Sequence, residues 1–242
     1  MKVLVISDIH ANLSALNAVL DHAPAVDAVW CLGDIVGYGP DPNECVETIR
    51  ELPNLVSLRG NHDGAVCGLV EKSKFNYSAQ EVLLWTEDQL KPNNRSYLAS
   101  LPAKTTESGV TLAHGSPRRP VWEYIMDSHA AEVNFTHFET DYCLVGHSHF
   151  PVLYLQREGK KQVEASYLGP NEKRNLLRKT IVNPGSVGQP RDHDHRAAYA
   201  LLDTDENLWS QYRISYDVHA VQQRMRDAGL PENYIQRIES GW

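Results

Sequence analysis

Short apolar runs that end abruptly in polar residues alternate with helical patterns over residues 1–60. The apolar segments Met1–Ile6, Ala28–Leu32 and Leu55–Leu58 are typical of strands buried on both faces of a parallel sheet. Between them, apolar residues recur at helical spacing over Leu13–Leu20, and Asp41–Pro42 supplies an N-cap followed by proline at the first helical position. The pattern predicts a strand–helix–strand–helix–strand unit, which belongs to the α/β class.

The segment 64–140 carries a weaker pattern. Residues 64–77 are expected to form a loop or a small cap. Ser78-x-x-Glu81 is a capping box that predicts the start of a helix, and a short helix is expected over Asn94–Leu101. Residues 121–139 are interpreted as a mixture of loop and helix. We therefore expect cap or insert elements within 64–140.

Further strands are expected at Val110–Ala113 and Asp141–Val145. The pattern then predicts antiparallel strands, which are Val152–Gln156, Thr180–Val182, Ala198–Asp203 and Trp209–Ser215. Asp217 is expected to cap a helix that runs to Ala228, and a last helix starts near Pro231. No repeat or clear linker interrupts the pattern, so residues 1–242 are predicted to form a single domain.

Composition narrows the class of partner. The formal net charge of −8 argues against a nucleic-acid backbone as the main partner, although it leaves a phosphorylated small molecule open because bound metal ions reverse a local field. The four cysteines are scattered without a CxxC pair, which predicts reduced thiols in a cytoplasmic protein. We see neither a signal peptide nor an apolar run of membrane-spanning length, so no membrane partner is expected.

Residues of metal-ligand type follow the predicted strands. Because the ends of parallel strands meet at one edge of a sheet, residues far apart in the sequence can converge there. The residues concerned are Asp8 and His10, Asp34, Asn61 and His62, His114, and His147 and His149. Such carboxylate, amide and imidazole donors suit Mn²⁺, Fe or Zn²⁺ better than Ca²⁺. The set is too large for one tetrahedral zinc ion and has about the number of donors that two ions sharing a carboxylate need.

Each of these residues also has an ordinary structural explanation when it is taken alone. Asp34 can start a turn, His114 can be a hydrogen-bonded strand-end residue, and the His147–His149 pair can be solvated. Their occurrence at five strand ends favours one common metal site over five unrelated turns.

The sequence resembles the calcineurin-like metallophosphoesterase superfamily, and in particular its small bacterial phosphodiesterase-like branch. The motifs that carry the resemblance are Asp8-x-His10, Gly33-Asp34, Gly60-Asn61-His62-Asp63, His114 and Gly146-His147-Ser148-His149. The resemblance implies a metallo-dependent phosphatase-like fold, a four-layer α-β-β-α sandwich. It also implies two metal sites, one formed by Asp8, His10, Asp34 and His149 and the other by Asp34, Asn61, His114 and His147, with Asp34 bridging the two ions.

The implied activity is metal-dependent hydrolysis of a small phosphodiester or phosphomonoester, nucleotides included, by a hydroxide that bridges the two ions. Mn²⁺ is the favoured ion, with Fe, Zn²⁺, Ni²⁺ and Mg²⁺ as alternatives. His62 is expected to act as general acid or to stabilise the transition state. Arg59 is expected either to clamp a phosphate or to be a strand-end surface arginine.

Two further positions near the predicted site have alternative interpretations. Asp63 either orients His62 or caps a helix, and the loop Asn183–Arg191 either borders the pocket or is a plain structural turn.

Two other functions are kept as alternatives. One is a catalytically silent protein-interaction scaffold of the same fold, and the other is a mononuclear metal hydrolase. A scaffold of this kind is expected to have lost ligands or the histidine at His62, and none of these is missing. The residues after Asp34 read Ile-Val-Gly-Tyr-Gly where phosphoprotein phosphatases have Asp-Arg-Gly, which argues against a protein phosphatase.

Overall fold

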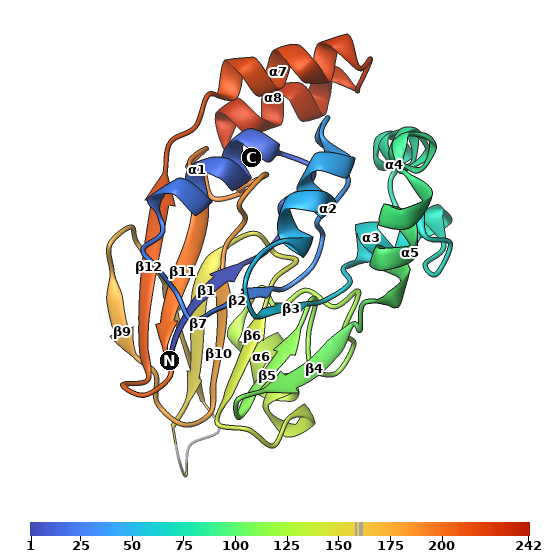
Figure 1. Ribbon diagram of the computed structural model, residues 1–242. Coiled ribbons are helices and arrows are strands. Elements are labelled where there is room, and N and C mark those ends of the chain that lie inside the picture. Colours follow the sequence, from blue (N-terminus) through green and yellow to red (C-terminus); the bar gives the residue numbers. More distant parts are fainter. Residues whose placement is uncertain (158, 160–161) are drawn as a thin grey trace.

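Two mixed six-stranded sheets pack face to face in the computed structural model, which describes residues 1–157, 159 and 162–242 (Figure 1). The first sheet has the order β3 (Leu55–Ser57), β2 (Ala28–Cys31), β1 (Lys2–Ile6), β11 (Ala197–Asp203), β12 (Leu208–Ile214) and β9 (Lys173–Asn175). The second has the order β4 (Lys104–Glu107), β5 (Val110–Ala113), β6 (Tyr142–Val145), β10 (Thr180–Pro184), β7 (Pro151–Gln156) and β8 (Val163–Tyr167). Each sheet contains three consecutive parallel strands, β3-β2-β1 in one and β5-β6-β10 in the other.

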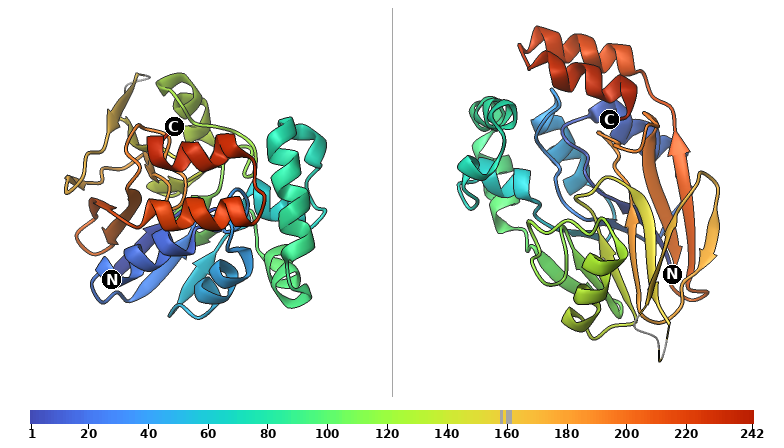
Figure 2. Two further views of the ribbon diagram at one scale, coloured as in Figure 1. Left: turned by 90° about the horizontal axis from the view of Figure 1, so that it is seen from above. Right: turned by 180° about the vertical axis from the view of Figure 1, so that it is seen from behind.

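Helices surround the two sheets, on their outer faces and at their edges and ends (Figures 1 and 2). They are α1 (Leu13–His22), α2 (Pro42–Arg50), α3 (Asn61–Val66), α4 (Tyr77–Gln89), α5 (Pro92–Ser100), α6 (Ser128–Asn134), α7 (Val218–Asp227) and α8 (Glu232–Ser240), with short 3₁₀ turns η1 (Lys72–Lys74) and η2 (Phe135–His137). The pair α7–α8 lies across one end of the molecule, above α1 in Figure 1.

Side chains of β1 alternate between two apolar layers. Val3 and Val5 point into a buried cluster shared with Leu112 of the second sheet, whereas Leu4 and Ile6 point into a cluster shared with α1 and α2. A third cluster joins the second sheet to α6. The order of layers is therefore helix, sheet, sheet, helix, which confirms the predicted sandwich.

The predicted strand–helix–strand–helix–strand unit is confirmed as β1, α1, β2, α2 and β3. The later strands are also present, but Thr180–Pro184 runs parallel to β6 as well as antiparallel to β7. The short, largely exposed strands β4, β8 and β9 were not expected, and the helix α3, which starts directly after the β3 turn, was considered only as the helix that Asp63 would cap.

The predicted capping box at Ser78 is wrong. The helix α4 begins at Tyr77, and the Asn76 side chain accepts the hydrogen bond from the Ala79 N–H at 3.0 Å. Asn76 supplies the same type of cap two residues earlier, so Ser78 lies inside the first turn. The cap predicted at Asp217 is confirmed, because its carboxylate accepts from the Ala220 N–H at 2.9 Å.

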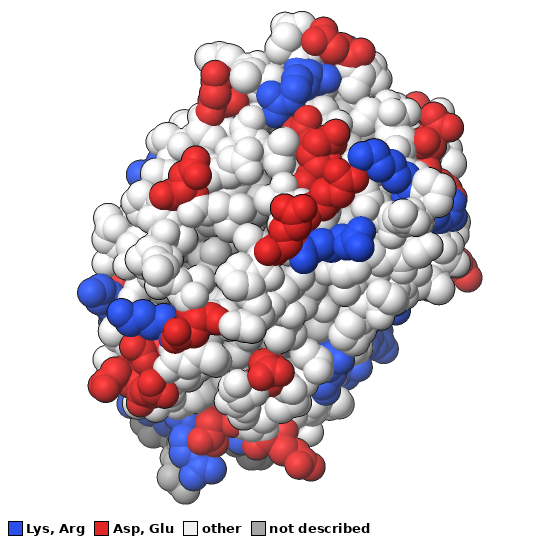
Figure 3. Space-filling model, in the orientation of Figure 1, with Lys and Arg blue, Asp and Glu red and all other residues white. Residues whose placement is uncertain are grey.

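Charged side chains of both signs are interspersed over the face shown in Figure 3. Several form ion pairs, such as Lys91 with Glu47 and Arg224 with Asp41. No helix among the described residues combines the length and the apolar character that crossing a bilayer requires.

The loop after β10 packs against the turn between β1 and α1. The N–H groups of Val187 and Gly188 donate to the carbonyls of Ser7 and Asp8, each at 3.0 Å. A Cβ atom at Gly188 would overlap the Ile9 carbonyl, so only glycine allows this approach.

We expect Gly188→Ala to lower the free energy of unfolding by about 1–3 kcal/mol, because the added methyl group must push two buried loops apart. The matched control is Gly169→Ala, whose Cβ would meet only the Glu172 carboxylate at an ordinary 3.6 Å. Urea unfolding of both variants measures the difference. Equal stability of the two variants would contradict this account of the loop.

Candidate metal centre

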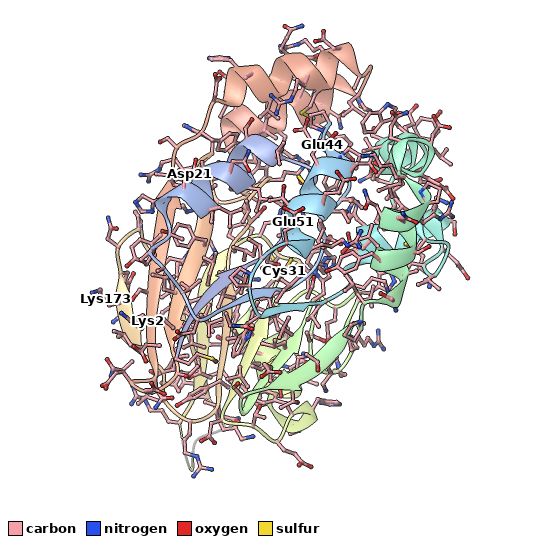
Figure 4. All side chains as sticks on the ribbon, in the orientation of Figure 1. Lys2, Asp21, Cys31, Glu44, Glu51 and Lys173 are labelled. Carbon is pink, nitrogen blue, oxygen red and sulfur yellow. The ribbon has the colours of Figure 1, made fainter. Side chains whose placement is uncertain are left out.

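Polar residues at the ends of five strands converge on one site between the two sheets. Cys31, which is labelled in Figure 4, is buried and is the last residue of β2, and Asp34 follows it three residues later. Five of the predicted ligands have positive φ angles, namely Asp8 (53°), His10 (49°), Asp34 (52°), His147 (65°) and His149 (63°). Such strained backbone turns side chains into one site and is concentrated at functional positions.

The first group of donors is Asp8, His10 and His149, whose ligand atoms all lie within 4.8 Å of one another. Asp8 Oδ2 accepts from Ser7 Oγ at 2.7 Å and from the His147 N–H at 3.0 Å, so it is fixed in place. Asp8 Oδ1 lies 3.3 Å from His149 Nε2, and the Nε2 atoms of His149 and His10 are 3.2 Å apart.

The second group is Asp34, His114 and His147, and Asn61 lies beside it. Asp34 Oδ2 is 3.4 Å from His114 Nε2 and 3.8 Å from His10 Nε2, so this one oxygen lies between the two groups. Asn61 Oδ1 is 3.0 Å from His114 Nε2. All seven predicted ligands are thus brought together.

Backbone carbonyls orient three of the imidazoles. The Nδ1 atoms of His10, His114 and His149 lie 3.3, 2.9 and 2.5 Å from the carbonyls of Val36, Leu32 and Gln189. An Nδ1–H that donates to a carbonyl leaves Nε2 with a free lone pair, which is the arrangement of histidines that bind metals. His147 Nε2 is buried without a hydrogen-bond partner among the described residues. The donor set and this unpartnered atom fit bound transition-metal ions.

Opposite charges inside the cluster determine its protonation. Burial would raise the pKa of Asp34, but the imidazoles of His114 and His62 hold that pKa far below its usual range. Burial would lower the pKa of His114, yet the Asp34 carboxylate raises it to about 9. A proton on His114 therefore balances the carboxylate in the metal-free chain, and a metal ion at the same place would replace that proton.

His62 and Asp63 have different surroundings although they are adjacent. The His62 N–H donates to Asp34 Oδ1 at 2.8 Å, and its ring lines a cavity of about 280 Å³ beside the two donor groups. Burial lowers the pKa of His62 to about 4. The Asp63 carboxylate accepts from the N–H groups of Gly60 and Val36 at 3.0 and 3.1 Å, which makes Asp63 a cap of α3.

Arg59 does not face the cavity. Its Nη1 donates to the carbonyls of Ala99 and Leu101 at 2.9 and 2.8 Å, so the strand-end position directs this side chain to α5 and the residue after it. This placement corrects the expectation that Arg59 clamps a phosphate. Two cations line the cavity, Lys74 and Arg191, and Arg191 stands at the end of the loop 183–191, which therefore does border the pocket.

Aromatic residues line the cavity with Arg191. Phe75 and Trp122 were expected from the sequence to form either an interface or a substrate wall, whereas Tyr38 and Tyr124 were not singled out. The available signals were the Gly- and Pro-rich composition around Arg191 and the aromatic residues in the segment expected to form a cap, but neither signal gives a direction in space.

Comparisons with known proteins cover the whole chain. A family model for the calcineurin-like phosphoesterase superfamily domain matches residues 1–207. The solved metallophosphoesterase of Sphaerobacter thermophilus is 44% identical and has a TM-score of 0.91, with 100% of this chain and 99% of that chain covered. Protein MJ0912 of Methanocaldococcus jannaschii is 38% identical over 99% of this chain and 98% of its own length. The symmetrical bis(5′-nucleosyl)-tetraphosphatase of Erwinia tasmaniensis is 40% identical over 67 residues, which are 26% of this chain and 24% of that enzyme.

The two arginines are expected to respond differently to the same substitution. Arg59→Met removes the group that donates hydrogen bonds to two carbonyl oxygens, so it should lower the free energy of unfolding by about 1–3 kcal/mol. Arg191→Met removes a cavity cation and should change that free energy by less than about 0.5 kcal/mol. Urea unfolding of both variants tests the assignment, and a reversed order of stability would contradict it.

Proposed function

The chain belongs to the calcineurin-like phosphoesterase superfamily, and on that basis we propose that it is a metal-dependent hydrolase of small phosphoesters, with nucleotides among its substrates. The observation that carries the proposal is the placement of Asp34 Oδ2 between two groups of buried donors. The short match to a bis(5′-nucleosyl)-tetraphosphatase supports nucleotides as a substrate class.

We assign the donors to two ions that share Asp34. One would be held by Asp8, His10 and His149, and the other by Asn61, His114 and His147. When bound, two such ions supply a water of lowered pKa as the nucleophile and positive charge for the phosphoryl oxygens.

His62 and the buried groups that hydrogen-bond to the donors would assist this chemistry. A pKa lowered to about 4 leaves the His62 ring neutral at pH 7, and a neutral imidazole has one N–H to donate. This favours His62 as a hydrogen-bond donor to the reacting phosphoryl group over a proton-carrying acid. Asp63, Ser7 and the three carbonyls that face Nδ1 atoms hold the donors in place before substrate binds.

The alternatives are disfavoured by the same residues. A scaffold without catalysis does not need seven converging donors, and all seven are present together with His62. A mononuclear hydrolase would leave either His10 or His114 as a buried imidazole that coordinates no metal ion.

The proposal is tested by removing and restoring metal. We expect the chelator-stripped protein to be inactive and to regain hydrolysis of bis-p-nitrophenyl phosphate or p-nitrophenyl phosphate with Mn²⁺, Zn²⁺, Ni²⁺ or Mg²⁺. Asp34→Ala should lose both bound metal, measured by mass spectrometry of the elements, and activity, because one carboxylate serves both groups. Full metal loading in Asp34→Ala would contradict the bridging role, and activity with one ion per chain would favour the mononuclear alternative.

His62→Ala should separate catalysis from metal binding. We expect kcat to fall by about 10²–10³-fold, as it does when one preorganised donor is lost, while metal content stays that of the wild type. His129→Ala, at an exposed position of α6, is the matched control and should change neither quantity. Undiminished turnover in His62→Ala would remove His62 from the mechanism.

A further inference from the structure

The cavity beside the donor cluster has an aromatic wall, formed by Phe75, Trp122 and Tyr124. The ring centroids of Phe75 and Trp122 are 5.0 Å apart, and Phe75 is also 5.0 Å from the His62 ring. Phe75 and Trp122 are half-buried, and Tyr124 is 45% exposed. Part of the ring surface in this wall is therefore free to contact a ligand.

The wall is held in place by a polar anchor beneath it. Trp122 and Tyr124 flank Glu123, whose carboxylate accepts hydrogen bonds from Ser116 Oγ at 2.6 Å and from Asn134 Nδ2 at 3.0 Å. Arg118 also pairs with this carboxylate. A loop tied down at its centre keeps the aromatic rings on both sides in fixed positions, which reduces the ordering cost of binding.

Arg191 adds a positive charge to the same cavity, which Lys74 and Asp34 also line. Its Nε atom is buried without a hydrogen-bond partner among the described residues, its Nη2 donates to Gln189 Oε1 at 3.0 Å, and the guanidinium also lies within hydrogen-bonding reach of the Tyr124 hydroxyl. The neighbouring acid, Asp192, pairs instead with Arg213. Arg191 lines the cavity together with His147 and His149, which places the guanidinium close to the donor cluster. A partly buried cation favours an anionic ligand.

We propose that this cavity binds a planar ring and its phosphate together, with the ring against Phe75, Trp122 and Tyr124 and a phosphate oxygen on Arg191. The inference rests on the proposed function and names its substrate class, which is aryl or nucleoside phosphoesters. At about 280 Å³ the cavity lies near the lower limit of ligand pockets, ~300–1,000 Å³, so it accommodates one ring and its phosphate better than a polymer.

Hydrolysis-resistant phosphonates test the proposal without relying on turnover. Calorimetry on the metal-reconstituted protein compares the methylenephosphonate of adenosine with that of ribose, a pair that differs only in the base. Because stacking on one aromatic side chain is worth about 1–3 kcal/mol per base, we expect the adenosine ligand to bind about 5- to 150-fold more tightly. Benzylphosphonate, which carries a phenyl ring but no nucleoside, distinguishes aryl phosphoesters from nucleoside phosphoesters. Equal affinity for it and the adenosine ligand indicates simple aryl esters, and weaker binding indicates nucleosides.

Variants assign the preference to the wall. Trp122→Leu, or Tyr124→Leu if the first variant unfolds, should remove most of the advantage of the adenosine ligand and leave the affinity for the ribose ligand unchanged. Arg191→Met should weaken both ligands by the same factor. Tyr167→Leu, at an exposed aromatic position on β8 outside the cavity lining, is the matched control and should change neither affinity.

Equal affinity of the wild-type protein for the two ligands, or no binding of either, would overturn the inference. So would an advantage of the adenosine ligand that survives in both wall variants. These outcomes are distinct from failure of the proposed function. If the protein hydrolyses bis-p-nitrophenyl phosphate but binds the adenosine and ribose ligands equally, only the inference is refuted. If it binds the adenosine ligand more tightly but hydrolyses no phosphoester, only the proposed function is refuted.

Discussion

The rest of the site depends on the contacts of one buried residue, Asp34. Its backbone carbonyl accepts the His10 N–H at 3.0 Å, so the turn after β2 holds the turn after β1. Its Oδ1 accepts the His62 N–H and thereby holds the start of α3, while Oδ2 faces His114 from the other sheet. The backbone carbonyl and the carboxylate of this one residue therefore join three strand ends and both sheets. The charge needs a cation beside it, because an isolated carboxylate in this interior would be strongly unfavourable.

The convergence of the candidate ligands could be predicted from sequence because the carboxyl ends of neighbouring parallel strands lie at one edge of the sheet. An apolar run fixes the direction of its strand, and the residue that follows must lie at the shared edge. Asp34 and His114, far apart in the chain, were placed together by this rule alone. Arg59 fits the same pattern and still points to Ala99 and Leu101, because the rule gives the position of a residue but not the direction of its side chain.

What could not be predicted depends on contacts between loops. Asn76 and Ser78 both have cap-forming side chains, and the packing around α4 selects the first. The strands β8 and β9 are largely exposed, so they lack the alternation that would have indicated them. Arg191 and the aromatic residues reach the cavity on loops whose conformations are set by Gly188, Glu123 and their partners. The net charge of −8 likewise does not reveal that Arg191 lines the cavity while its neighbour Asp192 pairs with Arg213.

The pairing of β1 has a consequence for how the protein is made. This first strand lies between β2 and β11, so one of its two neighbours leaves the ribosome nearly 200 residues later, as the register of Leu4 with Leu201 shows. His149 and the Gln189 carbonyl that orients it also appear late. A nascent chain that carries only Asp8, His10 and Asp34 has ligands but no enclosed site. The candidate ligands therefore come together in one enclosed site only after most of the chain has been made.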